Sequence, residues 1–238
     1  MSIRLLQGFD GARSATGLAV IIDVFRAFTT GLYAVRQGAK EIWAVADLDL
    51  AYQLKRENPG AVLMGERGGE MPPGFDFGNS PADIETEDFS GKTVIHTTCA
   101  GTPGVVAAMA NPQVEEVIAA SLANSTAVAE YLRGRVPELG TPTASIVAMG
   151  SSGETPSEED EACARRLHDL LLGQEPEPMT RVAQRLRTIP SAHKFFDPDK
   201  PWAPERDFTL CVNADLFHFV LRAEKASKTH VVLRPFPL

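Results

Sequence analysis

The stretch LAVIIDV, residues 18–24, is apolar at every position except Asp23. A strand with no polar alternation is buried on both faces, as in a parallel sheet that carries helices on both sides. The segment after it, FTTGLYAVRQGA (28–39), has the length and composition of a helix. A doubly buried strand followed by a helix is the repeating unit of α/β proteins, so this stretch predicts the fold class.

The same alternation continues to the end of the chain. Apolar runs of strand length predict strands at 18–24, 41–46, 61–66, 92–98, 115–121 and 143–150. Amphipathic segments predict helices at 28–39, 47–57 with Asp47 as N-cap, 102–110 with Thr102 as N-cap, 124–135, 157–173 and 178–188. The final segment, 217–235, predicts two strands joined by a polar turn.

These elements predict a single α/β domain over residues 1–238. Its sheet is expected to be mostly parallel, with helices on both faces and a C-terminal β-hairpin. No charged block or low-complexity linker marks a domain boundary. Residues 43–56 and 118–132 share a strand–cap–helix layout, which leaves an internal duplication open.

The bulk composition restricts the partners. The net charge is −8 and the pI is near 5.2, which argues against nucleic acid or an anionic membrane as the main partner. The three widely spaced cysteines are typical of reduced thiols in a cytoplasmic protein. We expect neither a signal peptide nor a membrane helix, because no apolar run approaches about 20 residues. A homodimer is one assembly that the sequence leaves open.

Ligands of such sheets bind beyond the carboxyl ends of the strands, where this chain carries polar and glycine-rich segments. The residues at these ends are Asp23, Arg26, Thr29 and Thr30 after the first strand, Glu66 and Arg67 after the third, Thr97, Thr98, Gly101 and Thr102 after the fourth, and Gly150, Ser151, Ser152, Gly153 and Glu154 ahead of the acids Glu158, Glu159 and Asp160.

This set of side chains favours chemistry on an anionic ester. Carboxylates bind Mg²⁺ through oxygen, arginine forks onto phosphate or sulfonate, and helix N-termini present amides to anions. No His–Cys pair with catalytic spacing and no zinc spacing occurs in the sequence. Plainer interpretations compete: Asp23 as a helix cap, Glu66–Arg67 as a solvated pair, and residues 158–160 as complement to a helix dipole.

Two family resemblances bear on this chemistry. IIDVFRAFTT (21–30) begins like the haloacid dehalogenase phosphatase signature, but that signature requires a second Asp where this chain has Phe25. A closer likeness lies in IDVFRAFTT (22–30), GERGG (65–69), GFDFGNSP (74–81), TTCAGT (97–102) and GSSGETPSEEDEACA (150–164). In this order the motifs resemble those of the 2-phosphosulfolactate phosphatase family.

The resemblance implies a three-layer α/β/α fold and Mg²⁺-dependent hydrolysis of a phosphate monoester. The substrate it implies is 2-phospho-3-sulfolactate, cleaved to 3-sulfolactate and phosphate as a step toward coenzyme M. Under this hypothesis Asp23, Glu66 and Asp160 hold Mg²⁺, and water attacks with Asp76 or Asp23 as the base. A phospho-Asp23 intermediate is the alternative.

The same hypothesis assigns the remaining site residues. Arg26 acts beside Asp23 and Asp76 as a catalytic residue, and it contacts the phosphate or the acidic groups of the substrate together with Arg67. The residues expected to bind substrate are Thr29, Arg67, Asn79, Ser80, Thr98, Gly101 and Thr102.

The chain departs from the family pattern at three positions. Cys99 and Ala100 replace Thr and Asn in the TTTNGT run, and bulky Phe28 follows the Arg-Ala pair. The changes at Cys99 and Ala100 keep a second function open, that of a carrier or sensor that binds a small phosphorylated or sulfonated acid without hydrolysing it. A third, purely structural function predicts that no ligand pocket lies at the strand ends.

Overall fold

Strands and helices alternate along the chain in the computed structural model, which describes residues 1–140, 143–225 and 230–238. The strands are β1 (Ser2–Gln7), β2 (Gly17–Ile22), β3 (Glu41–Val45), β4 (Val62–Gly65), β5 (Thr93–Thr97), β6 (Val114–Ala120), β7 (Thr143–Ala148), β8 (Phe219–Lys225) and β9 (Val231–Pro237). The helices are α1 (Gly8–Arg13), α2 (Ala27–Arg36), α3 (Leu48–Glu57), α4 (Pro81–Ile84), α5 (Gly101–Ala110), α6 (Ser125–Leu139), α7 (Glu158–Leu171), α8 (Met179–Leu186) and α9 (Glu205–Val212), with 3₁₀ turns η1 (Leu122–Asn124) and η2 (Pro190–Phe196).

The strands of the described residues form one sheet in the order β1-β7-β2-β6-β8-β9-β3-β5-β4. Strands β1, β7, β2 and β6 are mutually parallel, and so are β3, β5 and β4. The antiparallel hairpin β8–β9 lies between these two groups and pairs with β6 on one side and β3 on the other. The mostly parallel sheet and the C-terminal hairpin are confirmed, whereas most of the polar turn joining the hairpin strands falls at 226–229, outside the described residues.

The central position of the hairpin has a geometric consequence. Because all three pairings around it are antiparallel, the two parallel groups would point in opposite directions in a flat sheet. Five pairings separate β2 from β5, and a twist of roughly 20–25° at each adds up to about 100° or more. Twist therefore turns the carboxyl ends of β2 and β7 toward those of β4 and β5. Helix α5 packs in the resulting angle and contacts strands of both groups.

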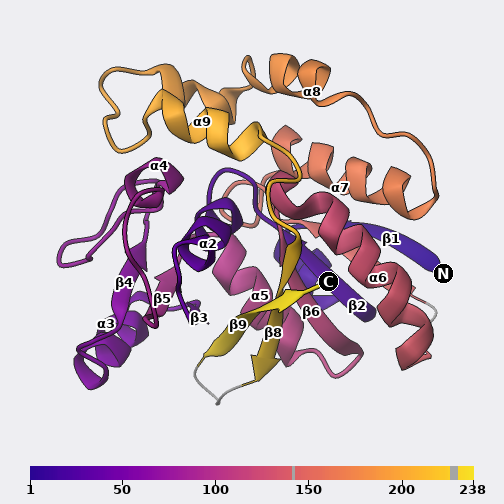
Figure 1. Cartoon of the computed structure of the whole chain (residues 1–238), viewed down its shortest axis with the longest axis horizontal. Coiled ribbons are helices and arrows are strands. Elements are labelled where there is room, and N and C mark those ends of the chain that lie inside the picture. The colour runs from indigo at the N-terminus through magenta and orange to yellow at the C-terminus, as the bar shows by residue number, and fades with distance from the viewer. Residues whose placement is uncertain (141–142, 226–229) are drawn as a thin grey trace.

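The sheet is the middle of three layers (Figure 1). Ala19 and Ile21 of β2 face the core under α1, α2 and α5, while Leu18, Val20 and Ile22 face the core under α6 and α7. A smaller core packs α3 against β3, β4 and β5. All six residues of β2 are buried, as the unbroken apolar run predicts.

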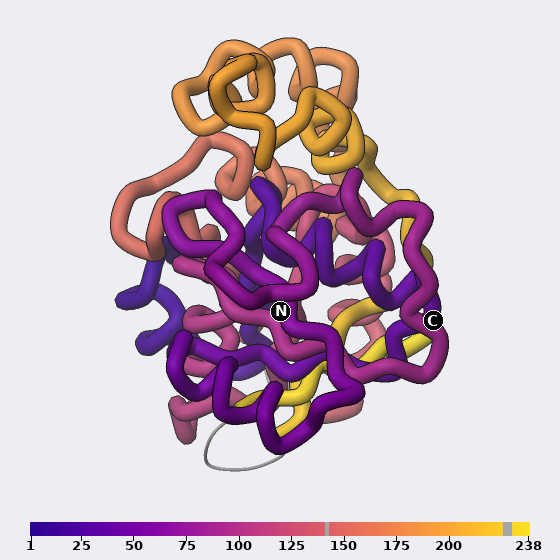
Figure 2. Tube along the Cα trace, turned by 90° about the vertical axis from the view of Figure 1, so that its left-hand side faces the viewer, coloured from indigo at the N-terminus to yellow at the C-terminus, as the bar shows by residue number. Residues whose placement is uncertain are grey.

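A segment that we call the cap, residues 178–212, lies across the carboxyl edge of the sheet. It comprises α8, η2 and α9, and Figure 2 shows it in orange above the rest of the chain. The sequence predicts only its first helix. Among the described residues no helix is both long and apolar enough to cross a membrane.

Two local predictions require correction. The apolar runs of the sequence indicate no strand before residue 18, yet β1 and α1 form there, with β1 paired to β7 at the edge of the sheet. Thr102 is not the N-cap of α5, because the helix begins at Gly101 with Ala100 in the cap position. The Thr102 hydroxyl instead donates to the Val45 carbonyl and accepts from the Thr98 N–H, which ties α5 to two strand ends.

Candidate active site

A cavity of about 230 Å³ lies between the loops after β2, β4, β5 and β7 and the cap. Five of the predicted site residues line it: Asp23, Arg26, Glu66, Asn79 and Asp160. They come from segments far apart in the sequence. The cavity excludes the purely structural function, which predicts no pocket at the strand ends, and it gives the convergence that the sequence hypothesis requires.

Asp23 and Asp160 fix the floor of the cavity. Asp23 follows β2, and its Oδ1 accepts a hydrogen bond from the Ala27 N–H at 3.0 Å. Asp160, in the first turn of α7, accepts from the Val24 N–H at 2.7 Å and from the Gly150 N–H at 2.8 Å. One carboxylate thus joins the loop after β2 to the loop after β7.

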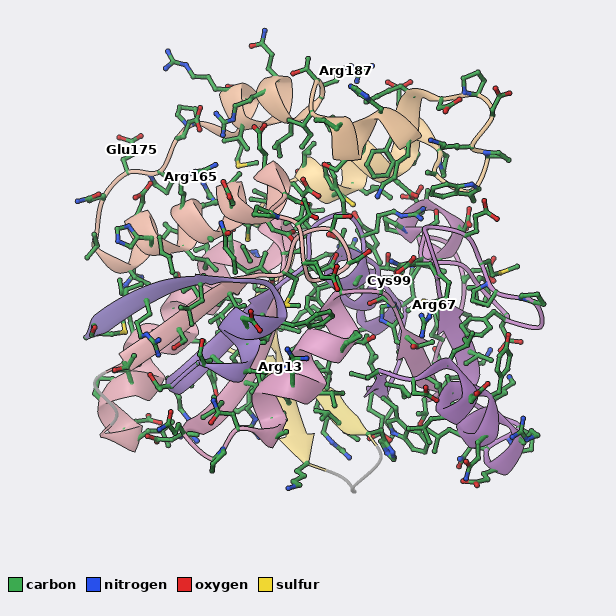
Figure 3. The ribbon with its side chains drawn as sticks, turned by 180° about the vertical axis from the view of Figure 1, so that it is seen from behind. Arg13, Arg67, Cys99, Arg165, Glu175 and Arg187 are labelled. Atoms are coloured by element: carbon green, nitrogen blue, oxygen red, sulfur yellow. The ribbon has the colours of Figure 1, made fainter. Side chains whose placement is uncertain are left out.

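Glu66 has the corresponding role on the opposite wall. Its Oε1 accepts from the Cys99 N–H at 2.7 Å, and its Oε2 accepts from the Gly69 N–H at 2.7 Å. These two bonds join the loop after β4 to the loop after β5. Figure 3 shows Cys99 and Arg67 close together in this region, below the cap.

Arg26 links the sheet to the cap. Its Nη1 donates to the Trp202 carbonyl at 2.6 Å and to Asp207 Oδ2 at 2.8 Å, and its Nη2 donates to the Gly69 carbonyl at 2.9 Å. Three of its five N–H groups are occupied in this way. Within the described residues, the other two N–H groups make no hydrogen bond, and Arg26 lines the cavity.

Burial raises the pKa of some of the cavity carboxylates. It raises the pKa of Asp23 to about 6, and the neighbouring Glu66 adds to the shift. Burial likewise raises the pKa of Asp160 well above its usual range, with repulsion from Glu159 and Asp23 as further causes. Among the described residues, four carboxylates and two cationic side chains, Arg26 and Lys194, line the cavity. The site therefore has an excess of negative charge that a cation would relieve.

The other predicted residues form the surroundings of the cavity. Arg67 donates to the Glu66 carbonyl and to Thr97 Oγ1, Ser80 caps α4 and donates to Asp207, and Thr29 donates to the Val24 carbonyl. Thr98 and Thr102 bond to each other. None of these side chains lines the cavity among the residues described.

Gly101 is placed against Asp23. A Cβ at this position would lie 2.8 Å from Asp23 Oδ2 and 3.0 Å from the Ala27 Cβ. Any larger residue would therefore displace the carboxylate at the N-terminus of α5. Steric contact with Asp23 therefore explains why the TTCAGT run has a glycine at position 101, and the sequence alone does not show this contact.

Asp76 does not enter the cavity. It accepts from Lys55 Nζ at 2.7 Å and from the Leu63 N–H at 2.7 Å, and its side chain is 40% exposed. It thus fastens the GFDFGNSP loop to β4. Asn79 from the same loop does line the cavity, and its Oδ1 lies 3.1 Å from His96 Nε2.

Sequence reasoning missed the contribution of the cap. Ser191, Lys194 and Trp202 line the cavity, and Ser191 donates to Glu159 Oε2 at 2.7 Å. Glu159 itself is buried, so burial raises its pKa. A polar, proline-spaced segment without apolar period gave no signal for these residues.

The donors suit Mg²⁺ by their chemistry. They are carboxylate oxygens, the ligands of hard cations, and their charge is in excess. No group of three or more His, Cys, Asp and Glu side chains is gathered at metal-binding distance within the described residues. Mg²⁺ does not require such a group, because it commonly keeps several waters and takes only one or two carboxylates.

Comparison with known proteins defines the class. The family model for 2-phosphosulpholactate phosphatase matches residues 7–226. A Bacillus subtilis protein described as a probable 2-phosphosulfolactate phosphatase is 29% identical over 98% of this chain and 99% of its own. Proteins of the same description from Thermotoga petrophila and Thermosynechococcus vestitus are 32% identical (85% of this chain, 87% of theirs) and 35% identical (76% and 72%). The chain is a phosphoric monoester hydrolase.

More narrowly, it belongs to the 2-phosphosulfolactate phosphatase family. The match covers the loops after β2, β4, β5 and β7 that build the cavity, and the whole cap.

Proposed function

We propose that the chain hydrolyses 2-phospho-3-sulfolactate to 3-sulfolactate and phosphate, with Mg²⁺ as cofactor. The relatives carry this activity in their descriptions. The observation that supports it most is the convergence of Asp23, Arg26 and Glu66 from separate segments in one cavity. The product would serve as a precursor of coenzyme M where that cofactor is made.

The size of the cavity supports a small substrate. A volume of about 230 Å³ leaves room for a small molecule. A phosphorylated three-carbon acid is of this order, whereas a nucleotide or a phosphoprotein loop is much larger. The cap adds walls on the side opposite the sheet, which favours a substrate that is enclosed by the site.

The carboxylates of Asp23, Glu66 and Asp160 would hold Mg²⁺ directly or through water. When bound, Mg²⁺ supplies charge neutralisation to the phosphate oxygens. The backbone bonds to Ala27, Cys99 and Gly150 fix these carboxylates before substrate arrives, so little reorganisation is needed during reaction. The two N–H groups that Arg26 retains would donate to the phosphate.

Glu159 takes the role of base that the sequence hypothesis gave to Asp76 or Asp23. It lines the cavity, is buried, and has a pKa raised by that burial. A carboxylate with raised pKa accepts a proton from an attacking water more readily near neutral pH. Asp76 is committed to Lys55 and Leu63 outside the cavity, and Asp23 is assigned to the metal.

Phosphate release from 2-phospho-3-sulfolactate, with Mg²⁺ and with a chelator, tests this function. Release that depends on Mg²⁺ is the expected result. Tight binding without release would instead support the carrier function. Acid quenching during turnover with labelled substrate should trap no phosphoprotein if water attacks. A trapped acyl phosphate on Asp23 would show instead that the Asp23 carboxylate, and not a water activated by Glu159, attacks the phosphorus.

A further inference from the structure

Lys194 is a cation of the cavity that the proposed reaction has not used. It comes from η2 of the cap, and its Nζ donates to the Phe25 carbonyl at 3.3 Å. Within the described residues it forms no ion pair, whereas Arg26, the other cation of the cavity, is paired with Asp207. The carboxylates of Glu159 and Asp23 attract its charge without a direct pair, so an anionic ligand would be its first direct ionic partner.

The surroundings of Lys194 agree with a place for an anion. Burial lowers the pKa of Lys194, and the positive charge of Arg26 lowers it further, although Glu159 and Asp23 act in the opposite direction. Glu159 of α7, which also lines the cavity, already accepts a hydrogen bond from Ser191 Oγ. An ammonium group with one long bond to a carbonyl retains two N–H donors for a ligand.

The two cations of the cavity are not equivalent. Arg26 is held by Trp202, Asp207 and Gly69, so its position is fixed by the fold. Lys194 comes from the cap, and its Nζ is held by one long hydrogen bond and lies 5.1 Å from the centre of the Phe195 ring. The phosphate would be neutralised by the metal and by Arg26 at the sheet edge. A second acidic group on the substrate would then require a separate cation.

We propose that Lys194 binds a second, non-reacting acidic group of the substrate, and so makes the enzyme selective for phosphorylated acids over simple alkyl phosphates. This inference rests on the proposed phosphatase function. The acidic group is a sulfonate or a carboxylate, since either would pair with the ammonium. Lys194 is thus a specificity residue, and the cap selects the substrate that the sheet-edge carboxylates help to cleave.

Three esters test the inference: 2-phospho-3-sulfolactate, 2-phospholactate and isopropyl phosphate, which has no second acid. Lys194→Gln should raise KM for 2-phospho-3-sulfolactate by about 10- to 100-fold, the usual effect of losing a charged hydrogen bond. It should change KM and kcat for isopropyl phosphate by less than about threefold. The effect on 2-phospholactate separates the two acids: a retained effect assigns the carboxylate, and a lost effect assigns the sulfonate.

Two further variants serve as controls. Lys194→Arg keeps the charge and should recover much of the affinity, which a purely structural role would not require. Lys200→Gln removes an exposed cap lysine that pairs with Asp197, and it should leave all three substrates unaffected. Circular dichroism on each variant confirms that the cap is folded.

An equal loss on all three esters would overturn the inference, because Lys194 would then act on the phosphate or on the fold. Unchanged kinetics would overturn it as well. If the wild-type protein with Mg²⁺ releases phosphate from none of the esters, the proposed function itself fails. Wild-type turnover without the selective effect of Lys194→Gln refutes only the role of Lys194.

Discussion

Arg26 and Asp207 form an ion pair of 2.8 Å between Nη1 and Oδ2, with side chains that are 1% and 0% exposed. Asp207 also accepts hydrogen bonds from Ser80 Oγ at 2.7 Å and from the Ala82 N–H at 3.0 Å. The pair joins the loop after β2, the N-terminus of α4 and helix α9 of the cap. Arg26 therefore holds the cap against the edge of the sheet.

Removing one member of this pair should destabilise the protein strongly. Asp207→Ala leaves a buried guanidinium without its counter-ion, and we expect a loss of about 3–5 kcal/mol in the free energy of unfolding. Glu205→Ala on the same helix removes an exposed pair with Arg187 and should change that free energy by about 0.5 kcal/mol or less. Urea unfolding measures both. A similar, small effect for the two variants would show that the buried pair does not hold the cap.

Gly101→Ala should reduce turnover without unfolding the protein. The added Cβ would lie 2.8 Å from Asp23 Oδ2, so the carboxylate must move. A displacement of about 1 Å at a reacting group costs roughly 10²-fold in rate. Gly134→Ala is a matched control, because it also lies in a helix but its Cβ would have no neighbour within 4 Å. It should keep full activity and gain about 0.5–1 kcal/mol of stability. Full activity of Gly101→Ala would contradict the position assigned to Asp23.

Buried His96 should make the fold sensitive to acid. Burial lowers the pKa of His96 from 6.5 to about 3, and the charge of Arg67 adds to the shift. Below pH 6.5 the unfolded chain binds a proton at this residue and the folded chain does not. The contribution of His96 to the free energy of unfolding is therefore fully present above pH 6.5. It falls by about 1.4 kcal/mol per pH unit as the pH drops toward 3.

The His96→Gln variant isolates this contribution. Gln can still donate to Asn79 Oδ1 but does not titrate, so its free energy of unfolding should fall less steeply between pH 6.5 and pH 4. The exposed His193→Gln serves as the control and should follow the wild type. Identical pH profiles for wild type and His96→Gln would rule out His96 as the source of the acid sensitivity.

Mg²⁺ should stabilise the folded protein through the cavity carboxylates. At 100 times its dissociation constant a ligand adds about 2.7 kcal/mol to the free energy of unfolding. We expect Mg²⁺ to raise Tm of the wild type, and Asp23→Asn to lose most of that rise because one donor becomes neutral. The exposed variant Asp10→Asn should retain the full rise. An unchanged response of Asp23→Asn to Mg²⁺ would remove Asp23 from the set of metal ligands.

Much of the fold follows from local sequence patterns. The unbroken apolar run at 18–22 gave a strand buried on both faces, and Asp47 caps α3 by accepting from the Leu50 N–H as predicted. The place of the β8–β9 hairpin in the middle of the sheet did not follow, because pairing order depends on contacts between distant segments. β1 was missed since it is an edge strand with exposed positions, which lacks the apolar signal of a buried one.

Part of the candidate site could likewise be predicted from local sequence, and part could not. Asp23 and Glu66 follow strands directly, and Arg26 lies in the loop after β2, so the rule that ligands bind at the carboxyl ends of strands identified them. Lys194 and Trp202 lie in irregular parts of the cap. No repeating pattern of apolar residues there shows which side chains face the cavity. Asp76 shows that a place in a family motif does not by itself put a residue in the site. It lies in the same motif as the cavity-lining Asn79, but the geometry of the loop directs its side chain to Lys55.

A comparison of Asp23→Asn with Asp76→Asn tests the central claim most directly, since both residues come from motifs of the family pattern and only Asp23 lines the cavity. The measurement is kcat for 2-phospho-3-sulfolactate in saturating Mg²⁺, on protein shown to be folded. We predict a loss of about 10²–10³-fold for Asp23→Asn, the usual effect of removing one fixed charged contact, and a change below about threefold for Asp76→Asn. Equal losses, or a greater loss for Asp76→Asn, would contradict the assignment of the active site to this cavity.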